Sequence, residues 1–372
     1  MVPTATRKRD YRLTGPENAL ARQKGLAAAE WYVCPVPRPK LKQLMKRKDG
    51  PAIRDTLLWF GALAAAGYAA YLSWGTWWAI PAFAVYGVLY ASPADSRWHE
   101  CGHGTAFKTP WMNEAVYQIA SFMILRPATP WRWSHARHHT DTIIVGRDPE
   151  IVAPRPPVWR VILMESFKLY GGPRDLKRML LHCFGKLDAE EREYIPASEI
   201  PKTCWESRVY VLIFAAVVIA CLYGGTVLPA LFIVLPSFYG SFLVLLTGMS
   251  QHLGLYEDVL DHRLNTRTTY MNPILRFLYW NMNYHTEHHM FPMVPYHALP
   301  KLHEEIRHDC PAPSPSLAAA LREVFQALAR QRKDPTYTIV RPLPETARPY
   351  RYGPAEETGA AQARQTNESL AK

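Results

Sequence analysis

The residues with the clearest chemical potential in this sequence are its histidines, because eight of the fourteen fall into three tight clusters. One cluster lies in the stretch WRWSHARHHTDT and spaces its histidines at i, i+3 and i+4, which on an α-helix share one face within about a 100° arc. Another repeats that spacing, and the remaining one places two histidines one helical turn apart. The clusters are His99 and His103; His135, His138 and His139; and His285, His288 and His289. Imidazoles gathered in this way are typical of a metal site.

The number of histidines indicates two metal ions, because eight ligands exceed what one tetrahedral or octahedral ion accepts. His252 is a ninth candidate, since it follows the fourth predicted membrane crossing at the same membrane level as His99, which follows the second. Imidazole binds iron, zinc and copper alike, so ligand type leaves the metal open. A site beside long apolar segments would meet substrates with unreactive C–H bonds, which favours oxygen activation at a non-haem diiron centre.

A different class of enzyme is also compatible with the first cluster. HECGH satisfies the H-E-x-x-H pattern, in which Glu100 would be the general base of a zinc membrane peptidase. Such an enzyme uses three protein ligands and an open position, so most of the clustered histidines would have no role. A non-enzymatic metal-binding membrane protein is a further alternative. We therefore expect Glu100 to support the site or to form an ion pair.

Other residues near the clusters are candidates for supporting roles. Metal-binding histidines usually donate their second ring N–H to a carboxylate or carbonyl oxygen. Tryptophans in the second cluster either wall the site or lie at a membrane interface, and the cysteine inside the first cluster points away from the histidine face, so we interpret it as packing. The candidate carboxylates are Glu100, Asp141, Asp148 and Glu287; the tryptophans are Trp131 and Trp133; the cysteine is Cys101.

The elements that must position these histidines are two long uncharged blocks. Residues 56–94 contain 39 residues without a charge, and residues 209–256 contain 48. An apolar bilayer core about 30 Å thick takes roughly 20 helical residues, so each block holds two crossings joined by a turn. The alternative is a soluble all-α protein with two buried hairpins, but blocks this long offer no polar face to water. The sequence predicts an all-α integral membrane protein with four transmembrane helices in two hairpins and a cytoplasmic helical cap carrying the histidines.

Basic residues before the first block set the orientation. Seven precede the first crossing, whereas neither hairpin turn carries lysine or arginine; they are Arg38, Lys40, Lys42, Lys46, Arg47, Lys48 and Arg54. By the positive-inside rule the amino-terminal side is cytoplasmic, and two hairpins return every cluster to that face. The formal charge of +11 comes without a recognisable nucleic-acid module, so anionic lipid is the simpler partner. An acidic electron carrier could also dock on this surface.

The chain is expected to divide into three parts. Residues 1–54 form a polar, basic cytoplasmic segment, residues 55–344 form the membrane domain with hairpins at about 56–94 and 209–247, and residues 345–372 form a disordered tail. Residues 115–125 are too short to span and predict an interfacial or buried helix, and residues 316–331 predict an amphipathic helix. The six cysteines show no disulfide spacing and are expected to be reduced thiols.

Three segments together resemble the membrane fatty acid desaturase and hydroxylase superfamily. They are HECGHGT at 99–105, HARHHTDT at 135–142 and NYHTEHHMFP at 283–292, in the order in which that family carries them. The resemblance implies a diiron centre whose ligands are His99, His103, His135, His138, His139, His285, His288 and His289, with an additional histidine matched by His252. In the acyl-CoA branch an asparagine occupies the position of Gly248, which argues against that branch here.

The resemblance also implies a reaction. Members use O2 and two electrons to remove two hydrogens and form a cis double bond in an acyl chain. The chain contains no HPGG-type cytochrome b5 segment, no clustered-cysteine iron–sulfur motif and no GxGxxG nucleotide motif, so we expect an external donor such as ferredoxin or cytochrome b5 with its reductase. We interpret the protein as an acyl-lipid desaturase, with diiron hydroxylation of a lipid or small molecule as the main alternative.

Overall fold

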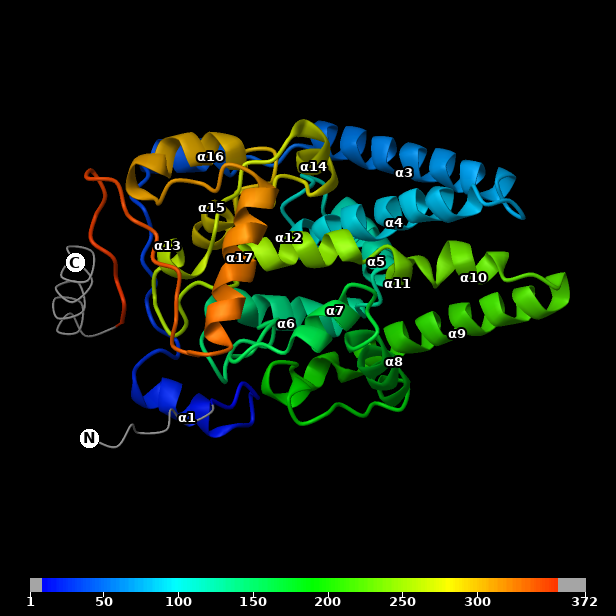
Figure 1. Ribbon diagram of the computed structural model, residues 1–372, viewed down its shortest axis with the longest axis horizontal. Helices are drawn as coiled ribbons and strands as arrows, with labels where there is room; N and C mark the ends of the chain where they lie inside the picture. Colours follow the sequence, from blue (N-terminus) through cyan, green and yellow to red (C-terminus); the bar gives the residue numbers. More distant parts are fainter. Residues whose placement is uncertain (1–8, 354–372) are drawn as a thin grey trace.

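The computed structural model describes residues 9–353, and within this range its regular secondary structure is entirely helical, with two isolated backbone bridges and no strand. Figure 1 shows long helices that project side by side toward one end of the molecule, while shorter helices form a compact body at the other end. The all-α prediction is therefore confirmed for the described part of the chain. The compact body contains every segment that carries a histidine cluster.

The first hairpin consists of α3 (Asp49–Leu72) and α4 (Ala79–Gly102), each 24 residues long. At 1.5 Å per residue each helix is about 36 Å long, which exceeds the apolar thickness of a bilayer. Apolar side chains in the first turns of α4, such as Ile80, are exposed, whereas its last turns are buried and polar. The first uncharged block thus forms paired helices, and α4 carries on into the first histidine cluster.

The second hairpin is less regular than the sequence predicts. Its first arm is α9 (Ile200–Gly224), which ends at Gly225 with a φ of 59°, a left-handed conformation that favours glycine. The return arm is three short helices and not one; they are α10 (Leu228–Ile233), α11 (Pro236–Tyr239) and α12 (Phe242–His252). Pro236 contributes to the break because its nitrogen carries no hydrogen for a helical hydrogen bond.

Tyrosine hydroxyls satisfy the backbone groups that this break leaves free. Tyr86 and Tyr90 of α4 donate to the carbonyl oxygens of Phe232 and Ile233 at 2.9 and 2.7 Å. The hydroxyl of Tyr239 donates to the Leu231 carbonyl at 2.8 Å. A buried carbonyl without a partner costs free energy comparable to a lost hydrogen bond, so these contacts stabilise the irregular arm.

A glycine pair lets α4 and α11 touch through their backbones. A Cβ on Gly240 would lie 2.0 Å from the carbonyl oxygen of Gly87, and a Cβ on Gly87 would lie 2.3 Å from the ring of Tyr239. No real side chain fits either gap. Glycine at both positions therefore fixes the depth at which the broken arm packs on α4.

One helical run within the described residues is long and apolar enough to cross a membrane by length and composition, and it is Ala197–Gly224. Only 17% of the most apolar 18-residue stretch of this helix is buried, whereas the core helix of a soluble protein is mostly buried. The helices α3 and α4 have comparable lengths but are less apolar than α9. By this measure the structure supports one of the four predicted crossings, and the other three stay predictions.

The compact body is built from short helices around one large core. Two predictions hold there: all but the last two residues of the segment 115–125 lie in a helix that ends at Met123, and the segment 316–331 forms a helix whose first turn is capped by the Ser316 hydroxyl. Its remaining helices are α1 (Pro16–Gln23), α2 (Arg38–Leu44), α5 (Pro110–Met123), α6 (Ala128–Thr140), α7 (Trp159–Glu165), α8 (Gly171–His182), α13 (His262–Asn265), α14 (Pro273–Leu278), α15 (His285–Met290), α16 (Leu299–Ile306) and α17 (Leu317–Gln331), with 3-10 turns at Glu191–Glu193, Ala197–Glu199 and Arg307–Asp309.

The helix α17 lies across α12 (Figure 1), and its apolar stripe packs against that helix. Val324 and Leu328 are buried against Met249 of α12, while Phe325 stacks on Trp159. Because α12 ends at His252, this packing helps to fix a histidine of the site. The three-part division of the chain stays a prediction, and residues 354–372 of the predicted tail lie outside the described residues.

Candidate metal centre

Four separate elements bring the nine predicted ligands together. The first cluster closes α4, the second lies on α6, His252 ends α12, and the third lies on the short helix α15. On α6 and α15 the i, i+3 and i+4 spacing turns the three imidazoles toward one side, as helical geometry requires. These elements are far apart in sequence, so their convergence is a tertiary result.

The nine histidines form two groups, each small enough to surround one metal ion. Within each group one ring nitrogen per residue lies within 4.8 Å of the others. One group is His99, His103, His135, His139 and His288; the other is His138, His252, His285 and His289. The two groups draw on all three clusters, so neither corresponds to a single motif. Every predicted ligand is present, and no other residue joins either group within the described part of the chain.

The facing nitrogen atoms are spaced as ligands of a common ion are spaced. Nε2 of His99 lies 2.6 Å from Nε2 of His288 and 3.2 Å from Nε2 of His135. In the second group, Nε2 of His285 lies 3.1 Å from Nε2 of both His252 and His289. Two nitrogens bound at right angles to one ion at ~2.1 Å lie about 3 Å apart. The donor set therefore fits two imidazole-bound metal ions.

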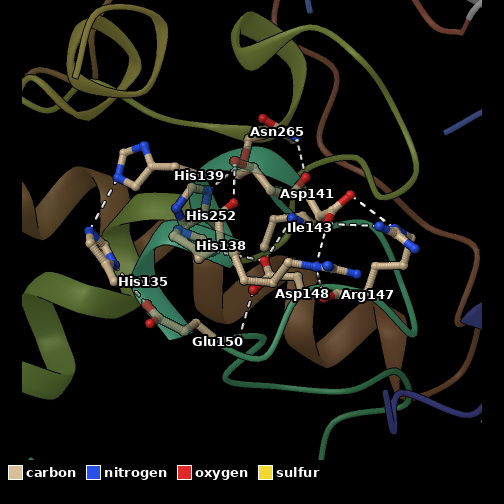
Figure 2. Close-up of polar contacts among 12 residues, drawn as sticks. His135, His138, His139, Asp141, Ile143, Arg147, Asp148, Glu150, His252 and Asn265 are labelled. Carbon is tan, nitrogen blue, oxygen red and sulfur yellow. Dashed lines mark hydrogen bonds and ion pairs between the residues drawn. The ribbon is translucent and has the colours of Figure 1, made fainter. Parts of the chain in front are cut away.

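The outer nitrogen atoms of several rings are held by oxygen acceptors, as in metal-binding histidines. Nδ1 of His138 lies 2.8 Å from a carboxylate oxygen of Asp148, and Nδ1 of His135 lies 3.1 Å from Glu150. Both carboxylates come from the loop that follows α6 (Figure 2). Nδ1 of His252 lies 2.8 Å from the Asn265 carbonyl. With Nδ1 donating outward, Nε2 keeps its lone pair for the inner side.

Three of the four carboxylates expected from sequence have other partners. Asp141 forms ion pairs with Arg137 and Arg147 and contacts no histidine (Figure 2). Glu100 accepts from the Thr105 hydroxyl at 2.7 Å and from the Tyr296 backbone N–H at 3.0 Å. It thus supports the fold beside the site and does not act as an ion-pair partner.

Glu287 faces away from the two groups as well. Its carboxylate binds Nδ1 of His303 at 2.5 Å and also accepts from the Thr268 hydroxyl. Nε2 of His303 in turn meets the Tyr270 hydroxyl at 3.0 Å. Of the expected carboxylates only Asp148 meets a predicted ligand, because helical spacing places the side chain of Glu287 on the opposite side of α15 from the site.

Sequence reasoning missed two residues beside the metal groups. Glu150 holds His135, and its position two residues after Asp148 in the GRDPE motif was an available signal. His262 lies on α13 with its ring centroid 5.1 Å from that of His289. Trp31 stacks on the His262 ring with a centroid distance of 4.3 Å and an interplanar angle of 4°. Nothing local to His262 predicted this contact, since it depends on how the amino-terminal segment covers the site.

The remaining predicted neighbours behave as follows. Cys101 is buried in the apolar core and belongs to neither metal group, in agreement with a packing role. Trp131 lines the cavity described below, whereas Trp133 is partly exposed and does not. All six cysteines are free thiols, as predicted.

Burial and mutual repulsion favour the neutral form of seven of the nine imidazoles. Desolvation is the largest effect and neighbouring histidines add to it, so that each of seven rings has a pKa well below its ordinary value; these are His99, His103, His139, His252, His285, His288 and His289. Burial also acts to lower the pKa of His138, but the Asp148 carboxylate outweighs it and the net shift is upward. Neutral imidazole is the form that binds metal.

A cavity of about 380 Å³ opens onto both groups of histidines. Its inner end is lined by His99, His135, His138, His252 and His285. Apolar lining comes from the loop after α6, including Ile151, and from α7 and α12, including Ile162 and Leu245, while Gly248 contributes no side chain. The charged residues of the lining are Asp95, Arg126, Glu150, Arg155, Glu165, Lys168, Arg174 and Glu257. A molecule in this cavity would reach both metal groups from one side.

The helical fold, the converging histidine clusters and the cavity beside them place this chain in a class of helical proteins with a histidine-rich candidate metal site. The sequence comparison identifies the family within that class: the family model described as fatty acid desaturase matches residues 75–319. This match covers most of the chain and includes all nine histidines. The chain belongs to the fatty acid desaturase family.

Individual relatives are more distant. A Δ(12) acyl-lipid conjugase (11E,13E-forming) of Impatiens balsamina is 30% identical over 144 residues, which is 35% of each chain. A Δ(12)-acyl-lipid-desaturase of Punica granatum is 31% identical over 86 residues, 23% of this chain and 20% of the relative. A Δ(12)-fatty-acid desaturase of Arabidopsis thaliana is 24% identical over 267 residues, 61% of this chain and 64% of the relative. The chain thus matches less than two thirds of the length of each of these relatives.

Proposed function

We propose that this protein is an O2-dependent diiron acyl-lipid desaturase that introduces a double bond into an acyl chain. The observation that carries the proposal is the cavity, since five histidines drawn from both metal groups line its inner end. The relatives described as acyl-lipid desaturases and conjugases support an acyl substrate. We expect all nine histidines to be iron ligands, five to one ion and four to the other.

The protein's part in the reaction follows from the positions of its side chains. Bound iron supplies oxygen activation and hydrogen removal, which amino-acid side chains do not provide. Asp148 and Glu150 hold His138 and His135 in the orientation and tautomer needed for binding. The cavity wall positions the acyl chain and excludes water, and small differences in the position of the attacked carbon decide between desaturation and hydroxylation.

Hydroxylation of a lipid or small molecule is the second candidate function. Charged side chains line the same cavity, among them Arg126, whose guanidinium lies 4.5 Å from the Trp98 ring centroid and pairs with Asp95 at 2.7 Å. Trp98 itself packs against His135 with ring centroids 5.2 Å apart. A polar substrate group would therefore find partners close to the histidines, which an unbranched acyl chain does not need.

The peptidase alternative has less support. Glu100 is engaged by Thr105 and the Tyr296 backbone, and its neighbours His99 and His103 share a group with three histidines from the other clusters. A zinc peptidase site needs only three protein ligands.

We further propose that the protein crosses the membrane four times, with α3, α4, α9 and the α10–α12 arm as crossings and the histidines on the cytoplasmic face. Reporter fusions at Gly75 and Gly225, in the two hairpin turns, would test this arrangement. Activity of an exported phosphatase at both turns supports it, while a cytoplasmic reporter signal at either turn contradicts it. Electrons would come from an external donor such as ferredoxin or cytochrome b5 with its reductase.

The decisive experiment is expression with a reductase system and deuterated lipid precursors, followed by mass analysis of every lipid pool. Loss of two hydrogens supports desaturation, and gain of one oxygen supports hydroxylation. His138→Ala is the control: it should abolish product while the protein stays in the membrane fraction. Turnover that survives His138→Ala would contradict the ligand assignment, and one zinc per chain with protease activity would overturn the oxygenase proposal.

A further inference from the structure

The segment 158–186, which contains α7 and α8, presents an unusually apolar surface. Seven of its large apolar side chains are exposed, and the most exposed are Leu163 at 70% and Phe184 at 77%. The full set is Val158, Leu163, Phe167, Leu169, Tyr170, Leu180 and Phe184. Exposed apolar side chains concentrated in one short segment indicate a site of interaction with a membrane or a protein.

The same segment is strongly basic on its outer side. It contains six lysine or arginine residues and two acidic residues. Both acids face inward: Glu165 accepts the Gly171 backbone N–H at 2.8 Å, and Asp175 is buried. Exposed basic residues are Arg160, Arg174, Lys177 and Lys186. Apolar side chains interspersed with cations are typical of helices that lie in a membrane interface with anionic lipid.

The position of the segment fits that location. The helix α8 packs against the start of α9, where that apolar helix leaves the compact body (Figure 1). Trp205, in the first turns of α9, is 67% exposed. Exposed tryptophan is enriched at the level of lipid headgroups. If α9 crosses the bilayer, α8 therefore lies at the depth of the headgroups on the histidine side.

The segment also borders the cavity. Val161, Ile162, Lys168, Tyr170 and Arg174 all line it, and Tyr170 and Arg174 are exposed as well, which places them at its mouth. The apolar and basic surface thus continues directly into the cavity that reaches the histidines.

We propose that residues 158–186 lie in the interface of a bilayer carrying anionic headgroups and form the rim through which a lipid enters the cavity. The charge of the surface favours anionic lipid over a second copy of this basic chain. The entry role rests on the proposed function, because it assumes a lipid substrate, whereas the interfacial location does not.

Photo-crosslinking from the exposed positions tests the location directly. A benzophenone amino acid replaces Leu163 or Phe184 in the full-length protein, which is reconstituted in nanodiscs of equal phosphatidylcholine and phosphatidylglycerol. The matched control carries the same probe at Val340, which is 46% exposed and lies in the carboxyl-terminal segment. We expect lipid adducts by mass spectrometry at Leu163 and Phe184, at least tenfold above those at Val340.

A charge variant tests the choice of lipid. Lys177→Gln with Lys186→Gln removes two exposed cations outside the cavity lining. Each surface lysine favours anionic lipid by about fivefold, so the enrichment of phosphatidylglycerol among adducts at Phe184 should fall by at least that factor. If the enrichment of phosphatidylglycerol is unchanged, the proposal that this segment prefers anionic headgroups is wrong.

The remaining outcomes are equally informative. Adducts to a second copy or to an added acidic electron carrier, in place of lipid, would overturn the proposal and assign the surface to that partner. Equal lipid labelling at Val340 would overturn it too, because the signal would then report bulk detergent or lipid. Lipid adducts form without iron or turnover. If the protein has no desaturase activity but the adducts form, the interfacial location is supported and only the entry role fails.

Discussion

Asp148 offers the sharpest test of how the metal centre is supported. Its carboxylate accepts three hydrogen bonds at 2.8 Å each, from Nδ1 of His138, the Ile143 backbone N–H and the Glu150 backbone N–H. It is 2% exposed, so water cannot replace these contacts. Asp148→Asn keeps the size of the side chain but removes its charge and turns one acceptor atom into a donor.

The expected effect is a loss of iron affinity. His138 would lose a charged acceptor that fixes its orientation, and such outer contacts are worth about 10- to 100-fold in metal affinity. This corresponds to roughly 1.4 to 2.7 kcal/mol. The measurement is iron bound per folded chain, by mass spectrometry of the metal, after equilibration with a graded series of chelator concentrations.

Asp141→Asn is the matched control, because Asp141 lies in the same loop, is equally buried, and pairs with Arg137 and Arg147 but not with a histidine. It should lower the melting temperature and leave iron affinity within about threefold of the unaltered protein, since it lacks the contact that tunes the metal. Unchanged iron affinity in Asp148→Asn, or an equal loss in both variants, would refute the reasoning.

Three further predictions concern stability. Burial raises the pKa of Glu100 from 4.5 to about 7, so the stability this carboxyl contributes is full below pH 4.5 and is lost as the pH rises through 7. Glu100→Gln should therefore match the unaltered protein at pH 4.5 and melt higher at pH 8.5, and a lower melting temperature at pH 8.5 would contradict this. Gly240→Ala should prevent folding, because its Cβ would overlap the Gly87 backbone; size-exclusion chromatography in detergent measures this. The control is Gly61→Ala, whose Cβ would lie in open space and which should be neutral or stabilising by about 0.5–1 kcal/mol. Arg263→Ala should lower the free energy of unfolding, measured with denaturant, by about 3–5 kcal/mol, because it leaves the buried carboxylates of Asp261 and Asp309 without their ion-pair partner. A decrease below about 1 kcal/mol would show that these ion pairs are not needed for stability.

The sequence by itself determined the candidate ligands and the helical class. The i, i+3 and i+4 spacing at His135, His138 and His139 is a local property of one helix, and the structure keeps it on α6. The uncharged length of the first block likewise demanded two helices joined at a turn, and α3 and α4 form them. These predictions succeeded because they depend on residues a few positions apart.

Only the tertiary structure decided which side chains support those histidines. Asp141 and Asp148 look alike in the sequence, yet the loop after α6 turns one toward arginines and the other toward His138. The division into groups of five and four, which mixes all three clusters, also depends on how α4, α6, α12 and α15 pack.

The broken return arm and the cavity are decided by packing in the same way. A run of apolar residues with prolines permits one helix or several, and the close approach of Gly87 and Gly240 selects the broken form. The cavity is bounded by residues from Asp95 to Gln331, so no local pattern encodes it. Sequence therefore specifies the candidate ligands through helical periodicity, whereas long-range packing specifies which side chains orient them and which cavity reaches them.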